Sequence, residues 1–242
     1  MERASKLLLW ELCRRVGHSS PLEVERKIDQ WAEVLGHVLS DLGARVVELG
    51  AGMSPKVVFA LHECGFRGSL VEVDLTKTAL RAQQLVGRML GVKYDLVVWE
   101  GDLFAYDLSS GDVVVASHLL DDLVAGRFAQ ERGMDYGEVF NDPEVQKKFW
   151  AEVGCEGKVA VEVVAGLGSK LATMRSGARV VMNEYLSNFD RKYDIRKRHL
   201  LCRQLLGRLG MEMEEGGFRK LETEQSLIEG EWLVMERVCP KR

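Results

Sequence analysis

Two glycines separated by one residue, with an acidic residue just before them, follow the first strongly apolar run of the chain. The stretch reads Val46-Val47-Glu48-Leu49-Gly50-Ala51-Gly52-Met53-Ser54-Pro55. Gly50 would allow a sharp turn, and Gly52 would let a ligand approach the backbone closely. Ser54 and Pro55 are typical of the N-cap and first position of a helix, whose free N–H groups attract polar ligands. The pattern predicts a nucleotide-type ligand at the end of a strand.

The negative charge of this turn favours a nucleotide without a pyrophosphate. A dinucleotide fingerprint needs a third glycine where Pro55 stands, and proline would crowd the packing of helix against strand. Glu48 would repel a pyrophosphate and attract a cation. S-adenosylmethionine carries a sulfonium and an ammonium group and no phosphate, so the charge pattern favours it. Glu48 could instead only cap the following helix.

Further acidic residues follow the next two apolar runs. Asp74 ends the run at 69–74, and Asp102 follows the run at 95–100 in Gly101-Asp102-Leu103. A carboxylate suits the binding of a ribose because it can accept hydrogen bonds from two hydroxyls. Asp74 could also be a helix cap, although Thr76 is better placed, and a Gly-Asp turn after a strand is common.

Taken in order, these motifs resemble the class I (Rossmann-like) S-adenosylmethionine-dependent methyltransferases. The resemblance covers residues 45–120 motif by motif and the later strands to about 238 in outline. It implies that the acidic-Gly-x-Gly turn contacts the methionine part of the cofactor, that Asp74 holds the ribose and that Asp102 lies near the adenine. Ser54 stands where the family has a third small residue, usually glycine. The residues expected to bind the cofactor are Glu48, Gly50, Ala51, Gly52, Ser54, Asp74, Leu75, Asp102, Leu103 and Ser117.

The resemblance also places a substrate-facing turn after the fourth strand, at Ser117-His118-Leu119-Leu120-Asp121-Asp122. His118 is a candidate general base, because the ordinary pKa of a histidine suits that role near neutral pH, and Asp121 is a second candidate. His118 could equally be structural, and Asp121 with Asp122 could be the favourable acids of a helix's first turn. The Asn/Asp-Pro-Pro-Tyr turn of adenine and glutamine N-methyltransferases is absent, which disfavours planar amines as acceptors.

Two further groups of residues have competing interpretations. Asn183-Glu184 could join Asp121 or Asp122 around a hard cation, similar to metal-dependent catechol-type methyltransferases, but the match is loose and we expect no metal. The basic run at 191–199 could bind nucleic acid, although a solvated helix face is the better interpretation. Tyr193 and Lys197 have the Tyr-x-x-x-Lys spacing found in short-chain dehydrogenases. The glycine turn and the upstream serine of that family are absent, so we treat the match as a coincidence.

The elements that must position these residues alternate between strands and helices. Apolar spacing predicts helices over 3–16 and 22–42, with a capping serine and a first-turn proline at Ser20-Pro21. Valine-rich strands are expected at 45–50, 69–74, 95–100, 112–117 and 179–184, with a helix over 77–90. Such alternation predicts an α/β fold with a doubly wound, mostly parallel sheet.

The end of the chain changes this pattern. After a helix near 191–210, the segments 211–220 and 231–238 look like two strands that pair antiparallel, because no crossover helix fits between them. They complete a seven-stranded sheet with an antiparallel last strand. Residues 122–177 are expected to form a helical insertion between strands 4 and 5 that covers the carboxyl edge of the sheet, with helices from Asp142-Pro143 to about Trp150 and over 158–174. The predicted domains are an N-terminal helical cap over 1–44 and a Rossmann-like cofactor-binding domain over 45–242.

The composition of the chain limits which partners and which cellular location we expect. The 242 residues carry a net charge of −4, which argues against a surface built for nucleic acid. Five scattered cysteines without a CxxC spacing, and no long apolar run, favour a cytoplasmic protein without disulfides or membrane contact. We expect a small-molecule acceptor, since the N-terminal helices and the insertion could wall a pocket. The alternatives are a nicotinamide-dependent oxidoreductase, a cofactor-binding protein without catalysis, and a protein or nucleic-acid methylase docking through the basic run.

Overall fold

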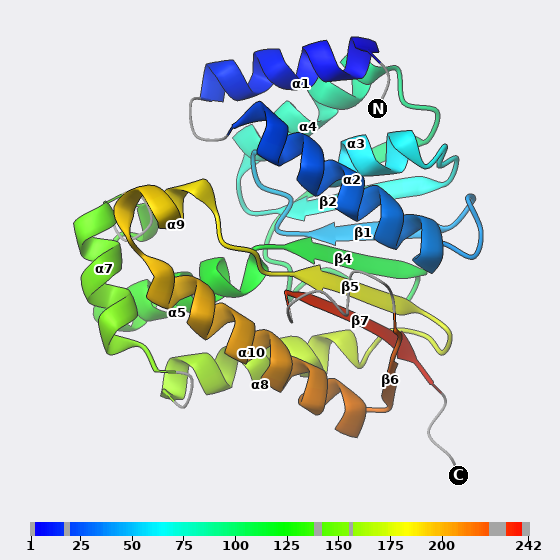
Figure 1. Ribbon diagram of the computed structural model, residues 1–242. Helices are drawn as coiled ribbons and strands as arrows, with labels where there is room; N and C mark the ends of the chain where they lie inside the picture. Colours follow the sequence, from blue (N-terminus) through cyan, green and yellow to red (C-terminus); the bar gives the residue numbers. More distant parts are fainter. Residues whose placement is uncertain (1–2, 17–19, 138–141, 155–156, 223–230, 239–242) are drawn as a thin grey trace. The chain divides into compact units, whose positions relative to one another are not determined.

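The computed structural model describes residues 3–16, 20–137, 142–154, 157–222 and 231–238. Within these residues seven strands form one sheet in the order β3-β2-β1-β4-β5-β7-β6 (Figure 1). β1 is parallel to β2 and β4, β2 is parallel to β3, and β6 is antiparallel to β7. The predicted doubly wound, mostly parallel seven-stranded sheet with an antiparallel end is therefore confirmed. The chain divides into two compact units, Met1–Ala116 with Ala178–Val180 and Ser117–Gly177 with Val181–Arg242.

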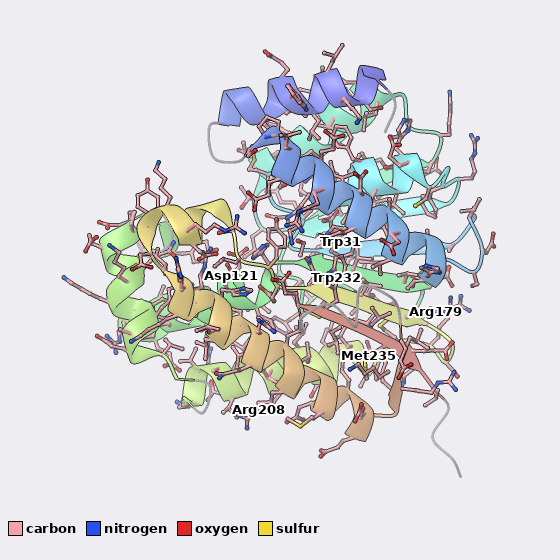
Figure 2. The ribbon with its side chains drawn as sticks, viewed as in Figure 1. Trp31, Asp121, Arg179, Arg208, Trp232 and Met235 are labelled. Carbon is pink, nitrogen blue, oxygen red and sulfur yellow. The ribbon has the colours of Figure 1, made fainter. Side chains whose placement is uncertain are left out.

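The first unit contains the alternating strands and helices that carry the glycine turn. Its strands β1, β2 and β4 are buried, as expected for parallel strands covered on both faces, whereas the edge strand β3 alternates between exposed and half-buried residues. α2 packs against α3, and the fully buried Trp31 lies on the inner face of α2 (Figure 2). The elements are α1 (Arg3–Val16), α2 (Pro21–Val38), β1 (Arg45–Leu49), α3 (Lys56–Glu63), β2 (Ser69–Asp74), α4 (Lys77–Leu90), β3 (Asp95–Glu100) and β4 (Val113–Ser117), of which Ser117 belongs to the second unit.

The second unit is mostly helical. α10 packs along α8 and also contacts α5 and β7 (Figure 1). Its buried stripe repeats every three to four residues, which explains why this segment forms one long helix. The elements are α5 (Leu119–Arg132), α7 (Pro143–Glu152), α8 (Lys158–Leu171), β5 (Arg179–Asn183, with Val181–Asn183 in this unit), α9 (Asn188–Tyr193), α10 (Arg196–Glu215), β6 (Phe218–Lys220) and β7 (Trp232–Arg237).

Several boundaries differ from the sequence prediction. The second helix ends at Val38 and not at 42, because Leu39 has extended backbone. α3 begins at Lys56, so Pro55 is at the N-cap position and Ser54 does not cap the helix. Residues 211–215, predicted as strand, continue α10 because Met213 extends its buried stripe from Leu209. β6 therefore has only three residues.

Ser20 is at the N-cap of α2 as predicted, although its side chain makes no capping hydrogen bond. The helix after the fourth strand already begins at Leu119, three residues before the predicted insertion. No helix in the described part of the chain is both long and apolar enough to span a bilayer.

Candidate functional site

The two glycines after β1 form a turn, as the sequence predicted. Gly50 and Gly52 both have left-handed backbone, with φ of 64° and 58°. The N–H of Gly50 donates to the carbonyl of Val73 at 2.9 Å, which ties the turn to β2. A Cβ on Gly52 would meet only the Gly50 carbonyl, at 3.8 Å. Glycine is needed there because of the backbone angle, since the space itself is open.

Asp74 organises this turn through both of its carboxylate oxygens. Oδ2 accepts a hydrogen bond from the Gly52 N–H at 2.9 Å, and Oδ1 accepts one from the Thr76 N–H at 2.6 Å. Thr76 is the N-cap residue of α4, as predicted, but its side chain makes no capping bond. Each carboxylate oxygen has a second lone pair, so Asp74 can still accept hydrogen bonds from two ligand hydroxyls.

Gln83 on α4 is a member of this site that the sequence reasoning missed. It is fully buried, and its Nε2 donates to the carbonyls of Ala51 at 3.1 Å and Gly52 at 2.9 Å. Without these two hydrogen bonds, the carbonyl groups of the turn would lack a donor from α4, and buried carbonyl groups normally accept a hydrogen bond. A signal was present, because Gln83 lies on the buried stripe of α4 between Leu80 and Val86.

Glu48 lies beneath the turn beside a second buried carboxyl group. Glu48 and Glu72 are register partners on the parallel strands β1 and β2, and they are 3% and 0% exposed. Burial, partly offset by Lys56 and reinforced by Asp74, raises the pKa of Glu48 to about 8. Burial, then Glu48 and Asp74, raise the pKa of Glu72 to about 10. Within the described residues Glu48 Oε2 and both carboxyl oxygens of Glu72 lack a hydrogen-bond partner, and burial favours the neutral form of both groups.

The ends of β1, β2 and β3 bring most of the predicted cofactor residues together. The N–H of Gly101 donates to the Asp74 carbonyl at 3.0 Å, so Asp102 follows directly beside the end of β2. Asp102 is exposed, and its Oδ1 accepts from the Phe104 N–H at 3.0 Å. Leu103 is buried, whereas Leu75 and Ser54 are exposed.

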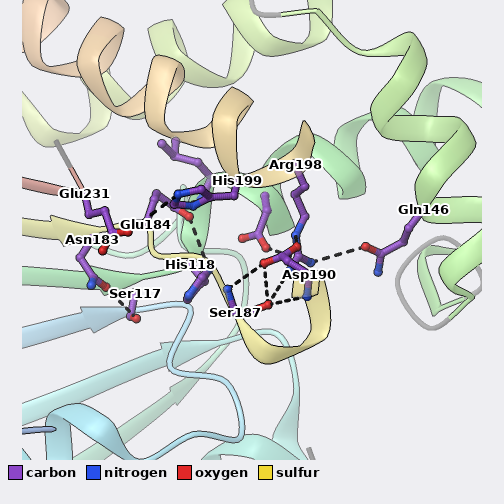
Figure 3. Close-up of polar contacts among 12 residues, drawn as sticks. Ser117, His118, Gln146, Asn183, Glu184, Ser187, Asp190, Arg198, His199 and Glu231 are labelled. Carbon is purple, nitrogen blue, oxygen red and sulfur yellow. Dashed lines mark hydrogen bonds and ion pairs between the residues drawn. The ribbon is translucent and has the colours of Figure 1, made fainter. Parts of the chain in front are cut away.

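Of the predicted cofactor residues, Ser117 belongs to the second unit, where its Oγ donates to Asn183 Oδ1 at 3.0 Å. The next residue, His118, is held in a left-handed conformation with φ of 57°. Its N–H donates to the Asn183 carbonyl at 3.0 Å, and its ring meets the Tyr185 ring edge-on at 4.1 Å between centroids. His118 Nδ1 lies 3.6 Å from Glu184 Oε2. Figure 3 labels both of these side chains.

Asp121, the second candidate catalytic residue, is almost fully buried in the first turn of α5. Its Oδ2 lies 3.4 Å from Nη1 of Arg198. Nε of Arg198 lies 2.7 Å from Asp190 Oδ1, and Figure 3 labels both of these side chains. Burial raises the pKa of Asp121, against the opposing effect of Arg198. Burial, with Asp121 adding to it, raises the pKa of Glu184 well above its ordinary value. The structure thus brings Asp121 and Glu184 together, as the metal alternative required; Asp122 instead accepts a hydrogen bond from the Tyr136 hydroxyl at 3.2 Å.

The predicted solvated basic face at 191–199 is correct only in part. Four of its cations are exposed, at Arg191, Lys192, Arg196 and Lys197. Arg198 is buried instead, because Asp190 and Asp121 supply the negative charge that a buried guanidinium needs.

Ser187 and Asp190, which the sequence reasoning did not use, form a capping box at the start of α9. The Ser187 hydroxyl also lies 3.1 Å from Nη2 of Arg198. The spacing of serine and an acidic residue three positions later was a readable signal for this helix start.

No family model matches the chain, and no curated protein matches its sequence. Among solved structures, the chain is similar to a Klebsiella pneumoniae protein provisionally described as an O-methyltransferase, with 11% identity and a TM-score of 0.52 over 99% of this chain and 92% of that one. It is also similar to the methyltransferase PaMTH1 of Podospora anserina bound to S-adenosylhomocysteine, with 11% identity and a TM-score of 0.51 over 98% of this chain and 88% of that one. At such identities the likeness shows the fold, which is that of the class I methyltransferases.

Proposed function

We propose that this protein binds S-adenosylmethionine at the glycine turn and transfers its methyl group to an acceptor. The observation that carries the proposal is the arrangement of Gly50 and Gly52 in left-handed conformation with Asp74 bonded to the Gly52 N–H. This arrangement stands at the ends of parallel strands in a methyltransferase fold, where ligands of open α/β sheets bind. The domain organisation expected above, a helical cap over 1–44 and a cofactor-binding domain over 45–242, is part of the proposal.

The residues at the turn fit a cationic nucleoside better than a dinucleotide. Glu48 has a buried carboxyl oxygen without a hydrogen-bond partner among the described residues, and a nearby sulfonium or ammonium group would favour the ionised form of this carboxyl group. The spare lone pairs of Asp74 suit ribose hydroxyls, and exposed Asp102 is available to an adenine amino group. S-adenosylmethionine supplies an electrophilic methyl group, while the protein has to hold the acceptor in line and exclude water.

His118 and Asp121 are the proposed catalytic residues of the second unit. An oxygen acceptor loses a proton during methyl transfer, and an imidazole has a suitable pKa to accept it. Tyr185 and the bond to Asn183 orient His118, which supports a positioned ring. Asp121 is held by Arg198 and is the weaker candidate for a proton acceptor.

We propose a small molecule as the acceptor in preference to a nucleic acid. The net charge of −4 and the burial of Arg198 support this choice, because fewer cations remain on the basic face than the sequence indicated. A nicotinamide cofactor is disfavoured by Glu48 and by Pro55 at the position of the third glycine.

Calorimetric titration with S-adenosylmethionine and, separately, with NAD tests the cofactor assignment. We expect binding of S-adenosylmethionine and at least tenfold weaker binding of NAD. Asp102→Asn should weaken S-adenosylmethionine binding about tenfold, as loss of a charge-assisted bond of about 1.5 kcal/mol would. Asp107→Asn is the matched control, because Asp107 also accepts from the N–H two residues later.

Equal binding of the two cofactors, or equal effects of Asp102→Asn and Asp107→Asn, would contradict the assignment. Turnover over a panel of small hydroxylated and aminated acceptors then separates an enzyme from a cofactor-binding protein without catalysis. Intact binding with no turnover on any acceptor class, including RNA and protein, would support the latter.

A further inference from the structure

Three side chains with metal-binding atoms converge in the second unit. His118, Asp121 and Glu184, here called the His118 cluster, each offer one ligand atom, and these atoms lie within 4.8 Å of one another. The residues come from the turn after β4, the first turn of α5 and the residue after β5. Asp121 and Glu184 are 4% and 2% exposed, so the cluster is shielded from water on most sides.

In each carboxylate of the His118 cluster, one oxygen contacts a backbone N–H or Arg198. The other oxygen accepts no hydrogen bond from the described residues and could bind an ion. Glu184 Oε1 accepts from the Leu120 N–H at 3.1 Å, which leaves Oε2 near His118 Nδ1. Asp121 Oδ2 faces Arg198, whereas its Oδ1 is buried and has no hydrogen-bond partner among the described residues. Outer hydrogen bonds of this kind orient the carboxylates and imidazoles that ligate metal ions.

The spacing suits a shared ion better than a direct hydrogen bond. The 3.6 Å between His118 Nδ1 and Glu184 Oε2 is too long for a hydrogen bond. Two ligand atoms bound at about 2.0–2.1 Å to one tetrahedral ion lie roughly 3.3 Å apart. The three ligand atoms, which lie within 4.8 Å of one another, would have to move closer to reach that separation.

Among the described residues, the buried acidic groups around the His118 cluster outnumber the buried basic groups. Asp121, Glu184 and Asp190 are all buried, and Arg198 is the buried cation that faces Asp121 and Asp190. The single guanidinium of Arg198 can balance only one of these three buried carboxyl groups. Buried charges are stable when they are paired or coordinate a metal, so a divalent ion would balance this group.

We propose that the His118 cluster binds a divalent transition-metal ion of the Zn²⁺ or Mn²⁺ type. One imidazole and two carboxylates form a mixed nitrogen and oxygen donor set, which such ions accept and which Mg²⁺, preferring oxygen alone, does not favour. Three protein ligands leave a coordination position for water or an acceptor oxygen, as in catalytic sites. With an ion bound, His118 and Asp121 would be its ligands, and the proton-accepting role proposed above would apply to the chain without the ion. This proposal does not depend on cofactor binding.

Metal titration of the full-length chain tests the site directly. After treatment with a chelator and dialysis, the protein is titrated with ZnCl₂ and with MnCl₂, using elemental analysis for stoichiometry and electron paramagnetic resonance for bound Mn²⁺. We expect about one ion per chain and a rise in Tm with Zn²⁺. His118→Asn and Glu184→Gln should each weaken binding at least tenfold, while MgCl₂ at the same concentration should give no rise in Tm.

Glu231→Gln is the matched control, because Glu231 lies 3.8 Å from Nε2 of His199 in a second histidine–glutamate pair of the same unit. We expect its metal binding to equal that of the unaltered chain. Circular dichroism checks that each variant is folded. If the unaltered chain binds less than a tenth of an ion per chain, or if both folded variants bind as tightly as Glu231→Gln, the cluster is only an ion pair and the proposal is wrong. The unaltered chain decides the first outcome even if a variant does not fold.

Discussion

At the scale of single residues, the carboxyl pair Glu48 and Glu72 makes stability depend on pH. Both have pKa values raised above the ordinary value of 4.5, to about 8 and about 10. The folded state therefore binds more protons than the unfolded state above pH 4.5, and its stability falls as the pH rises toward these values. Each such group lowers the free energy of unfolding by up to about 1.4 kcal/mol per pH unit.

Glu72→Gln removes one of these groups while keeping its shape. We expect the unfolding free energy of the variant to fall less steeply than that of the unaltered chain between pH 6 and pH 9, by about 1 kcal/mol per pH unit. Urea unfolding at several pH values measures this slope. Glu100→Gln, at the exposed end of β3, should leave the slope unchanged. Parallel slopes for Glu72→Gln and the unaltered chain would show that Glu72 is not protonated in the folded state.

At the scale of elements, α4 supports the glycine turn through Gln83. Gln83→Leu removes the donor to the Ala51 and Gly52 carbonyls, and leaving buried carbonyls unsatisfied costs about 1–3 kcal/mol. We expect that loss in chemical unfolding, together with weaker binding of S-adenosylmethionine. Gln84→Leu, at the neighbouring and less buried position, is the control. Full stability of Gln83→Leu would show that the turn holds its shape without α4.

The connection from α9 to α10 depends on Arg198. Arg198→Met leaves Asp121 and Asp190 without their buried cation, and breaking a buried ion pair costs about 3–5 kcal/mol. Thermal and urea unfolding should show this loss, whereas Arg196→Met on the exposed face should unfold as the unaltered chain does. A small effect of Arg198→Met would contradict the expectation that Asp121 and Asp190 need this buried cation.

At the scale of the whole molecule, surface charge helps to decide whether the acceptor is a small molecule or a nucleic acid. Reversing the exposed pair with Arg196→Glu and Lys197→Glu changes the basic face without touching buried Arg198. For a small-molecule acceptor we expect no change in the binding of S-adenosylmethionine and only weak binding of RNA by either protein, measured by fluorescence anisotropy at physiological salt. Tight RNA binding that the double variant loses would instead indicate a nucleic-acid acceptor.

Most of the fold and part of the site could be predicted from local patterns. Valine-rich runs, a glycine pair and first-turn prolines act over a few residues, so strands, turns and most helix starts were readable. The predicted end of α10 was wrong. The short apolar alternation at 211–220 is compatible with both a helix and a strand, so the sequence did not show where the helix ends. Packing of Met213 with the rest of the buried stripe of α10 decided the outcome.

The sequence by itself determined the order of elements, the position of the glycine turn and the acidic residues at strand ends, since these depend on backbone sterics and on periodicity along the chain. Only the tertiary structure decided which polar side chains meet. Glu48 faces Glu72 through strand register, Gln83 reaches the turn from α4, and Arg198 joins Asp121 across many residues of sequence. Such pairings depend on register and helix packing, which no short stretch of residues specifies.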